Sequence, residues 1–334
     1  MTQDYEEIKI IEEKKEEGIF KSIVKWFFSN MKFLLIPGSR LEDLTKREIE
    51  YEKKRGKRKF IRRLKPVLTI TGMVIIFIIV TFAVFAPWIS PYTFAELNGF
   101  YFDPYSPASP AHILGTTKFG RDIFGRIIFG ARASLTIALP AILFSLGVGI
   151  VIGITAGYYG GWVDTVLMRL MDILLAFPWL VLALVFISIF EERRIEYIML
   201  SFGILGIAGY ARLIRGSVLQ AKELPYIQAA RVAGAGNKRI MFKHILPNTI
   251  QPIIISFTFD IGGVILGLAA ISFLNFSDWR LIEWGNDIAF ARVHLYDAPW
   301  ASFWPGIMIL ITVLGFMLFG DGLRDALDPR LKNL

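Results

Sequence analysis

Long runs of apolar residues alternate with charged stretches along this chain, and the pattern predicts membrane helices. A hydrocarbon core about 30 Å thick requires roughly 20 apolar residues of helix. Six windows meet this requirement, at residues 67–87, 133–157, 170–190, 195–214, 249–274 and 301–320. The windows lack the period-two alternation of barrel strands, and in lipid only a helix satisfies its backbone groups within one segment. We therefore expect an all-α polytopic membrane protein with six transmembrane helices.

Composition agrees with a membrane protein and narrows its chemistry. The chain has 334 residues, 54% of them hydrophobic, and its mean hydropathy of +0.52 is too high for a soluble globule. It contains no cysteine, so disulfides and thiolate sites are excluded. A net charge of +8 would suggest nucleic acid in a soluble protein, but basic residues of membrane proteins gather in cytoplasmic loops. We expect a multi-pass protein of the cell membrane, in contact with lipid and without a nucleic-acid partner.

Charges beside the windows predict the orientation of the chain. Residues 53–65 carry nine basic groups and no acid immediately before the first window, which places the N-terminus in the cytoplasm. Six spans then return the C-terminus to the cytoplasm, together with the loops 158–169 and 215–248. Several basic residues at 117–132 would lie on the outer side, and we interpret that segment as an interfacial helix.

The same patterns predict three regions. Residues 1–66 form a cytoplasmic N-terminal extension, which opens with acidic residues and is therefore not a signal peptide. Apolar residues recur at helical spacing between about 18 and 36, which predicts an amphipathic helix that lies on lipid headgroups or packs on protein. Residues 67–132 hold the first transmembrane helix and an outer loop, and residues 133–334 form the core domain.

The cytoplasmic loop 215–248 has the residues of a compact helical hairpin. Gly234 and Gly236 end one helix where a left-handed backbone is easily reached, and Pro247 redirects the chain into the fifth span. Small residues give the hairpin a face that another protein can approach closely. They are Ala229, Ala230, Ala233 and Gly234. A solvated basic loop is the alternative interpretation.

Two short runs in this loop carry a resemblance to a known family. Residues 228–234 read Gln-Ala-Ala-Arg-Val-Ala-Gly, and residues 244–248 read His-Ile-Leu-Pro-Asn. This spacing resembles the EAA loop of ABC importer permeases. The chain further resembles the second permease of oligopeptide/dipeptide importers at 114–122, 130–135, 157–164 and 320–330, so the resemblance covers roughly residues 67–334. It departs from that pattern at three positions. Gln228 stands where glutamate is usual, Leu268 where an acid is frequent, and Met317 where asparagine is usual.

The resemblance implies a type I ABC importer permease fold, with both termini in the cytoplasm. It implies a heterodimer with a second homologous permease, two ATPase subunits that bind ATP and Mg, and an extracellular solute-binding protein. It also implies that six residues carry the contact with the ATPase, namely Gln228, Ala229, Ala230, Gly234, Leu246 and Pro247. The implied solute is a peptide, with an oligosaccharide or a metal chelate as alternatives.

Asp260 is the only acid well inside a predicted span. An ionisable group in hydrocarbon is costly and normally faces a partner, water or substrate. Three roles stay open for it: lining the translocation pathway, a structural pair at a helix contact, and proton coupling. The third defines an alternative function, a proton-coupled secondary transporter, although the two halves of the chain show no evident repeat.

Candidate catalytic chemistry is absent from the sequence. There is no Gly-x-x-x-x-Gly-Lys-Ser/Thr loop, so ATP must be bound by another subunit. The three histidines lack metal-ligand spacing, and no Ser/His/Asp set falls in one place. We expect no catalytic, cofactor-binding or metal-binding residue, and a protein that is not an enzyme.

Two further patterns concern packing and the membrane interface. Gly149, Gly153 and Gly157 recur every fourth residue, and Gly263 with Gly267 does the same, which predicts close contacts between helices. Five aromatic residues fit an interfacial belt better than a sugar platform. They are Trp279, Trp284, Tyr296, Trp300 and Trp304.

Overall fold

The computed structural model describes Lys21, Val24, Leu64 and residues 66–99, 103–190 and 194–327. By its internal contacts the chain divides into two units, Met1–Arg62 and Arg63–Leu334, and the helices below belong to the second. The predicted amphipathic helix at 18–36 lies outside the described residues apart from Lys21 and Val24. The domain boundaries drawn from the sequence stay predictions.

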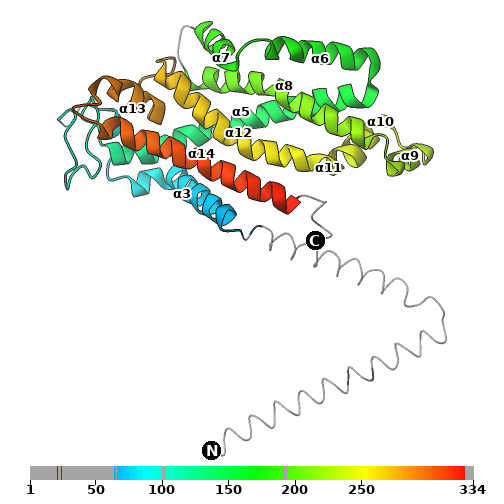
Figure 1. Cartoon of the computed structure of the whole chain (residues 1–334), viewed down its shortest axis with the longest axis horizontal. Helices are drawn as coiled ribbons and strands as arrows, with labels where there is room; N and C mark the ends of the chain where they lie inside the picture. The colour runs from blue at the N-terminus through cyan, green and yellow to red at the C-terminus, as the bar shows by residue number, and fades with distance from the viewer. Residues whose placement is uncertain are drawn as a thin grey trace, which may run out of the picture. The chain divides into compact units, whose positions relative to one another are not determined.

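Within the part of the chain that the structure describes, five helices are long and apolar enough to cross a membrane. Figure 1 shows how they are arranged. They are α3 (Val67–Ile89), α5 (Ile123–Tyr159), α8 (Ile195–Ala221), α12 (Ile250–Phe273) and α14 (Trp300–Leu327). The pair α6 (Gly161–Leu175) and α7 (Trp179–Ser188) is a sixth candidate if it counts as one span. Within the described ranges the all-α prediction is confirmed, whereas the number six and the orientation of the termini stay predictions.

Short helices lie between these long ones. They are α4 (Phe94–Asn98), α9 (Pro225–Val232), α10 (Asn237–Arg239), a π-helix (Ile240–Ile245), α11 (Leu246–Asn248), α13 (Trp284–Ala291) and a 3-10 turn (Arg292–His294). The largest apolar core joins α3, α5, α8, α12 and α14 with the buried face of the π-helix.

The third apolar window is not one straight helix. The axes of α6 and α7 meet at 85°. The bend precedes Trp179 at Pro178, which lacks a backbone N–H and disfavours helix in the residue before it. At the other end, Gly160 (φ +66°) and Gly161 (φ +53°) turn the chain between α5 and α6. Most of the predicted loop 158–169 is therefore helical.

The segment 117–132 is not a separate interfacial helix, because α5 begins at Ile123 and continues for 37 residues. Asp122 caps its N-terminus, where the carboxylate accepts a hydrogen bond from the N–H of Gly125 at 2.7 Å. Ile127 and Ile128 in its first turns are buried. These turns belong to the protein core. Arg121 and Arg126, which were predicted at the interface, find partners inside the fold, whereas Lys118 and Arg132 are exposed.

Glycines bring α5 and α8 into backbone contact. A Cβ added to Gly149 would lie 2.6 Å from the Cβ of Tyr210, and one added to Gly153 would lie 2.5 Å from the carbonyl oxygen of Ala211. The packing role predicted for this series is therefore confirmed. The prediction is wrong for Gly263, since an added Cβ would meet nothing within 4 Å there.

Candidate coupling loop and translocation cavity

The bundle carries different structures at its two ends. Figure 1 shows α9 and α10 at one end of the long helices and α13 at the other. We call residues 225–248, from α9 to α11, the coupling hairpin. The contacts around α13 form a second feature, which we call the buried polar cluster and which comprises Leu97, Arg121, Arg126, Trp284 and Asp287.

The first helix of the coupling hairpin ends in a Schellman motif. The N–H of Gly234 donates to the carbonyl of Arg231 at 2.9 Å, and the N–H of Ala235 donates to the carbonyl of Ala230 at 3.0 Å. Gly234 has a φ of +79°, the left-handed conformation that glycine adopts without strain. The turn predicted at this glycine is confirmed, and a side chain there would strain the backbone rather than meet a neighbour.

The predicted ATPase-contact residues lie on the outside of the hairpin. Four of them are exposed and two are partly buried. The exposed ones are Gln228, Ala229, Gly234 and Pro247, and the partly buried ones are Ala230 and Leu246. Beside them Val232 is 91% exposed, an apolar side chain left in contact with solvent. Their contact with an ATPase stays a prediction.

The inner side of the hairpin is joined to the core and to the end of α5. Ile227, Ile240 and Ile245 are fully buried and belong to the largest apolar cluster. The hydroxyl of Tyr158, the second-last residue of α5, donates to Oδ1 of Asn237 at 2.9 Å. The guanidinium of Arg231 lies 5.7 Å from the Tyr158 ring centroid, within cation–π range. The hairpin thus has a bonded inner side and a free outer side.

Asp260 lies on the wall of a cavity of about 700 Å³ formed by residues of α5, α6, α7, α8 and α12. It is the only charged residue in the lining and is itself partly buried. The buried hydroxyl of Tyr210 interacts with the Asp260 carboxyl, although without a hydrogen bond of normal geometry. Of the three roles left open for Asp260, this position favours lining the translocation pathway. The function of Asp260 in transport stays a prediction.

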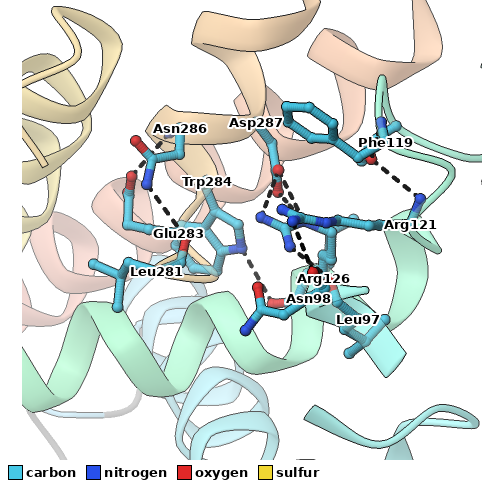
Figure 2. Close-up of polar contacts among 12 residues, drawn as sticks. Leu97, Asn98, Phe119, Arg121, Arg126, Leu281, Glu283, Trp284, Asn286 and Asp287 are labelled. Atoms are coloured by element: carbon cyan, nitrogen blue, oxygen red, sulfur yellow. Dashed lines mark hydrogen bonds and ion pairs between the residues drawn. The ribbon is translucent and has the colours of Figure 1, made fainter. Parts of the chain in front are cut away.

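The buried polar cluster joins α13 to the first turns of α5 (Figure 2). Nε of Arg126 donates to both carboxylate oxygens of Asp287, at 2.8 and 2.9 Å, and Nη1 donates to the carbonyl of Leu97 at 2.9 Å. The two charged side chains are 1% and 5% exposed. Trp284 adds a hydrogen bond from its indole N–H to the carbonyl of Ile127 at 3.1 Å.

Two more ionisable groups are buried near this ion pair. Arg121 donates to the carbonyls of Asn98 at 2.8 Å and Gly99 at 3.3 Å. Burial, and secondarily the positive charge of Arg126, lowers the pKa of Arg121 to about 10, so it is still protonated at neutral pH. Burial raises the pKa of the Glu283 carboxyl, which caps α13 by accepting from the N–H of Asn286 at 3.1 Å.

Sequence reasoning missed this cluster. Trp284 was expected in the interfacial aromatic belt, but its side chain is fully buried, while Trp279 and Tyr296 are exposed. Arg126 was expected at an interface and is instead paired with Asp287, 161 positions later. The one local signal is an acid on each side of Trp284, at positions 283 and 287. Among the described residues, no group of three or more His, Cys, Asp or Glu could hold a metal ion.

Two family models match the chain. Residues 149–333 match the binding-protein-dependent transport system inner membrane component, and residues 60–107 match the N-terminal TM domain of oligopeptide transport permease C.

Curated relatives cover most of the chain. The dipeptide transport system permease protein DppC of Alkalihalophilus pseudofirmus is 39% identical, over 80% of this chain and 87% of the relative. The glutathione transport system permease protein GsiD of Pectobacterium atrosepticum is 38% identical, over 83% of this chain and 92% of the relative. The di/tripeptide transport system permease protein DppC of Pseudomonas aeruginosa is 40% identical, over 78% of this chain and 88% of the relative.

Proposed function

Because the chain belongs to the family of binding-protein-dependent transport system inner membrane components, and is therefore a membrane permease of an ABC importer, we propose that it forms half of a pathway for small peptides. In this proposal the coupling hairpin receives the movement of ATPase subunits on the cytoplasmic side. ATP and Mg are bound by those subunits. The other half of the pathway comes from a second, homologous permease, and a solute-binding protein delivers the peptide from outside.

The observation that supports coupling most strongly is the two-sided construction of the hairpin. Its inner side shares the core of α3, α5, α8, α12 and α14, so a displacement of the hairpin must move these helices or break buried contacts. Its outer side presents alanines, glycine and the exposed Val232, a surface that another protein can approach closely. A rigid attachment on one side and a free face on the other are what a force-transmitting contact requires.

The relatives support the class of solute. Their names refer to dipeptides, di/tripeptides and glutathione, which are all small peptides. We therefore propose a small peptide ahead of an oligosaccharide or a metal chelate.

Family membership favours ATP-driven import over the proton-coupled alternative built on Asp260. These two mechanisms are distinguished by measuring peptide uptake in sealed vesicles. One set of vesicles holds ATP on the side of the ATPase, and another is exposed to a pH gradient without ATP. Uptake that requires ATP supports the importer, whereas uptake driven by the pH gradient without ATP would favour the secondary transporter.

The docking role of the hairpin is tested by co-purification. Ala229→Trp places a large side chain on the exposed face of α9, and Ala95→Trp places the same side chain on the exposed face of α4, another short helix. We expect the Ala229 variant to insert in the membrane but to lose both the ATPase subunits on purification and ATP-dependent uptake. The Ala95 variant should keep the ATPase subunits. Retention of the ATPase by the Ala229 variant would contradict the docking role.

A further inference from the structure

The cavity beside α12 has the composition of a site for a cation. Its lining contains one carboxylate, that of Asp260, and no lysine, arginine or histidine. Trp179, Phe202 and Tyr210 contribute aromatic rings, whose faces attract cations, and most of the other lining residues are aliphatic. A negatively charged group would therefore find no partner in this lining, whereas a positively charged group would find an acid and aromatic faces.

Acceptors for a primary ammonium group converge on one part of the wall. Ser256, Asp260 and Gly263 are spaced four and three residues apart, so they share one face of α12, and all three line the cavity. Tyr210 on α8 lines the same cavity and is only 4% exposed, and its hydroxyl interacts with the Asp260 carboxyl without a hydrogen bond of normal geometry. An ammonium group has three donors and no acceptor, which suits a carboxylate and two hydroxyl oxygens.

Glycines leave the space that such a group needs. A Cβ on Gly209 or Gly263 would meet nothing within 4 Å, whereas one on Gly153 of α5 would lie 2.5 Å from a backbone oxygen. Both glycines line the cavity. The volume of about 700 Å³ lies within the range of small-molecule sites, roughly 300–1,000 Å³, and exceeds what one ammonium group requires.

We propose that this cavity is a subsite for the protonated amino group of the transported solute, and that Asp260 is the residue that pairs with it. The inference rests on the proposed function and adds a direction to it. A peptide passes with its amino end held by this subunit, and its carboxylate end is bound outside this lining.

The absence of cysteine from the chain makes a direct test possible. Ser256→Cys puts one thiol on the cavity wall, one helical turn from Asp260. It is reacted with a cationic and an anionic methanethiosulfonate of similar size, in membranes that hold the whole transporter. Each rate is divided by the rate of the same reagent with free 2-mercaptoethanol. Since both reagents attack the same thiolate, the ratio of the two normalised rates reports the local potential and not the pKa of the thiol.

We expect the cationic reagent to be favoured about tenfold, the effect of one nearby unit charge in a protein-like medium. Asp260→Asn should bring the ratio close to that of a neutral site, and Asp260→Glu should keep the preference. A control thiol from Asn248→Cys, exposed and outside the cavity, should show a ratio that Asp260→Asn leaves unchanged. Equal rates at position 256 that do not respond to Asp260→Asn would overturn the proposal.

Protection against labelling tests the amino group itself. Trialanine should slow the labelling of Ser256→Cys, N-acetyl-trialanine at the same concentration should not, and Asp260→Asn should remove the difference. Equal protection by the two peptides, or protection by neither, would refute recognition of the ammonium group. Failure of the proposed function is distinguished from failure of this inference by peptide uptake. If the proposed function were wrong, the unmodified transporter would show no ATP-dependent peptide uptake. If only this inference failed, that uptake would persist.

Discussion

The two ends of the helical bundle use their polar residues in opposite ways. In the buried polar cluster, Arg126 and Asp287 are both removed from solvent and bonded to each other. In the coupling hairpin, Lys238 and Arg239 are exposed, and the neighbouring Asn237 makes the hydrogen bond to α5. A buried charge requires its partner, whereas an exposed charge keeps its hydration. The first arrangement immobilises two helices, and the second leaves a face for another protein.

One helix connects these ends. Arg126 lies in the first turn of α5 and Tyr158 in its last, so the two residues are roughly 48 Å apart at 1.5 Å per residue. The close packing of α5 on α8 through Gly149 and Gly153 makes this connection stiff. One continuous helix thus joins the coupling hairpin to the cluster around α13.

Arg126→Met should lower stability the most. It leaves the carboxylate of Asp287 buried without its partner, which costs about 3–5 kcal/mol. The measurement is thermal unfolding of the purified protein, followed by tryptophan fluorescence. Arg239→Met, at an exposed position of the hairpin, is the matched control and should change stability by less than about 0.5 kcal/mol. Similar losses in both variants would remove the distinction between the two ends.

Gly234→Ala should destabilise the hairpin locally by about 1–2 kcal/mol, because a residue with a Cβ is strained at a φ of +79°. Hydrogen exchange of the α9 amides should become faster, while exchange in α5 and α8 is unchanged. Gly236→Ala is the control, since Gly236 has a φ of −68° and open space around it. Faster exchange in the Gly236 variant alone would contradict the Schellman geometry.

Tyr158→Phe should weaken the attachment of the hairpin by about 1 kcal/mol, since it removes one hydrogen bond to Asn237 and keeps the ring. We expect less solute transported per ATP hydrolysed, with the ATPase subunits still bound. Tyr159→Phe alters the neighbouring, half-exposed tyrosine and should leave this ratio unchanged. An unchanged ratio in the Tyr158 variant would exclude the attachment at Asn237 from coupling.

The smallest effect is expected from Glu283→Gln, because the amide oxygen can still cap α13. Burial raises the pKa of Glu283 above its ordinary value of 4.5, so the folded state binds this proton more tightly than the unfolded state. The stabilisation from protonation is complete below pH 4.5 and is lost as the pH rises through the raised pKa. In the variant, melting temperature should fall less with rising pH across this window, and at neutral pH stability should be equal or slightly higher. An unchanged pH dependence would contradict the raised pKa.

The length of the apolar runs predicts the long helices because each of them needs enough apolar residues to cross lipid, and this information is local. Turn chemistry is also local, which is why the turn at Gly234 was predictable. The bend before Trp179 was not predictable, because prolines such as Pro178 occur in straight and in bent membrane helices. The pair of Arg126 and Asp287 depends on a contact across 161 positions, and no local pattern contains it. The same holds for Gly263, whose spacing suggests packing although the fold places it on a cavity.

Cross-linking from α9 tests most directly whether the coupling hairpin is the contact with the ATPase. Ala229→Cys in this cysteine-free chain is labelled with a benzophenone maleimide and irradiated in membranes that hold the whole transporter. We predict an adduct with an ATPase subunit, whereas Ala95→Cys at the opposite end should give none. An adduct from position 95 and none from position 229, with both thiols equally labelled, would contradict the account.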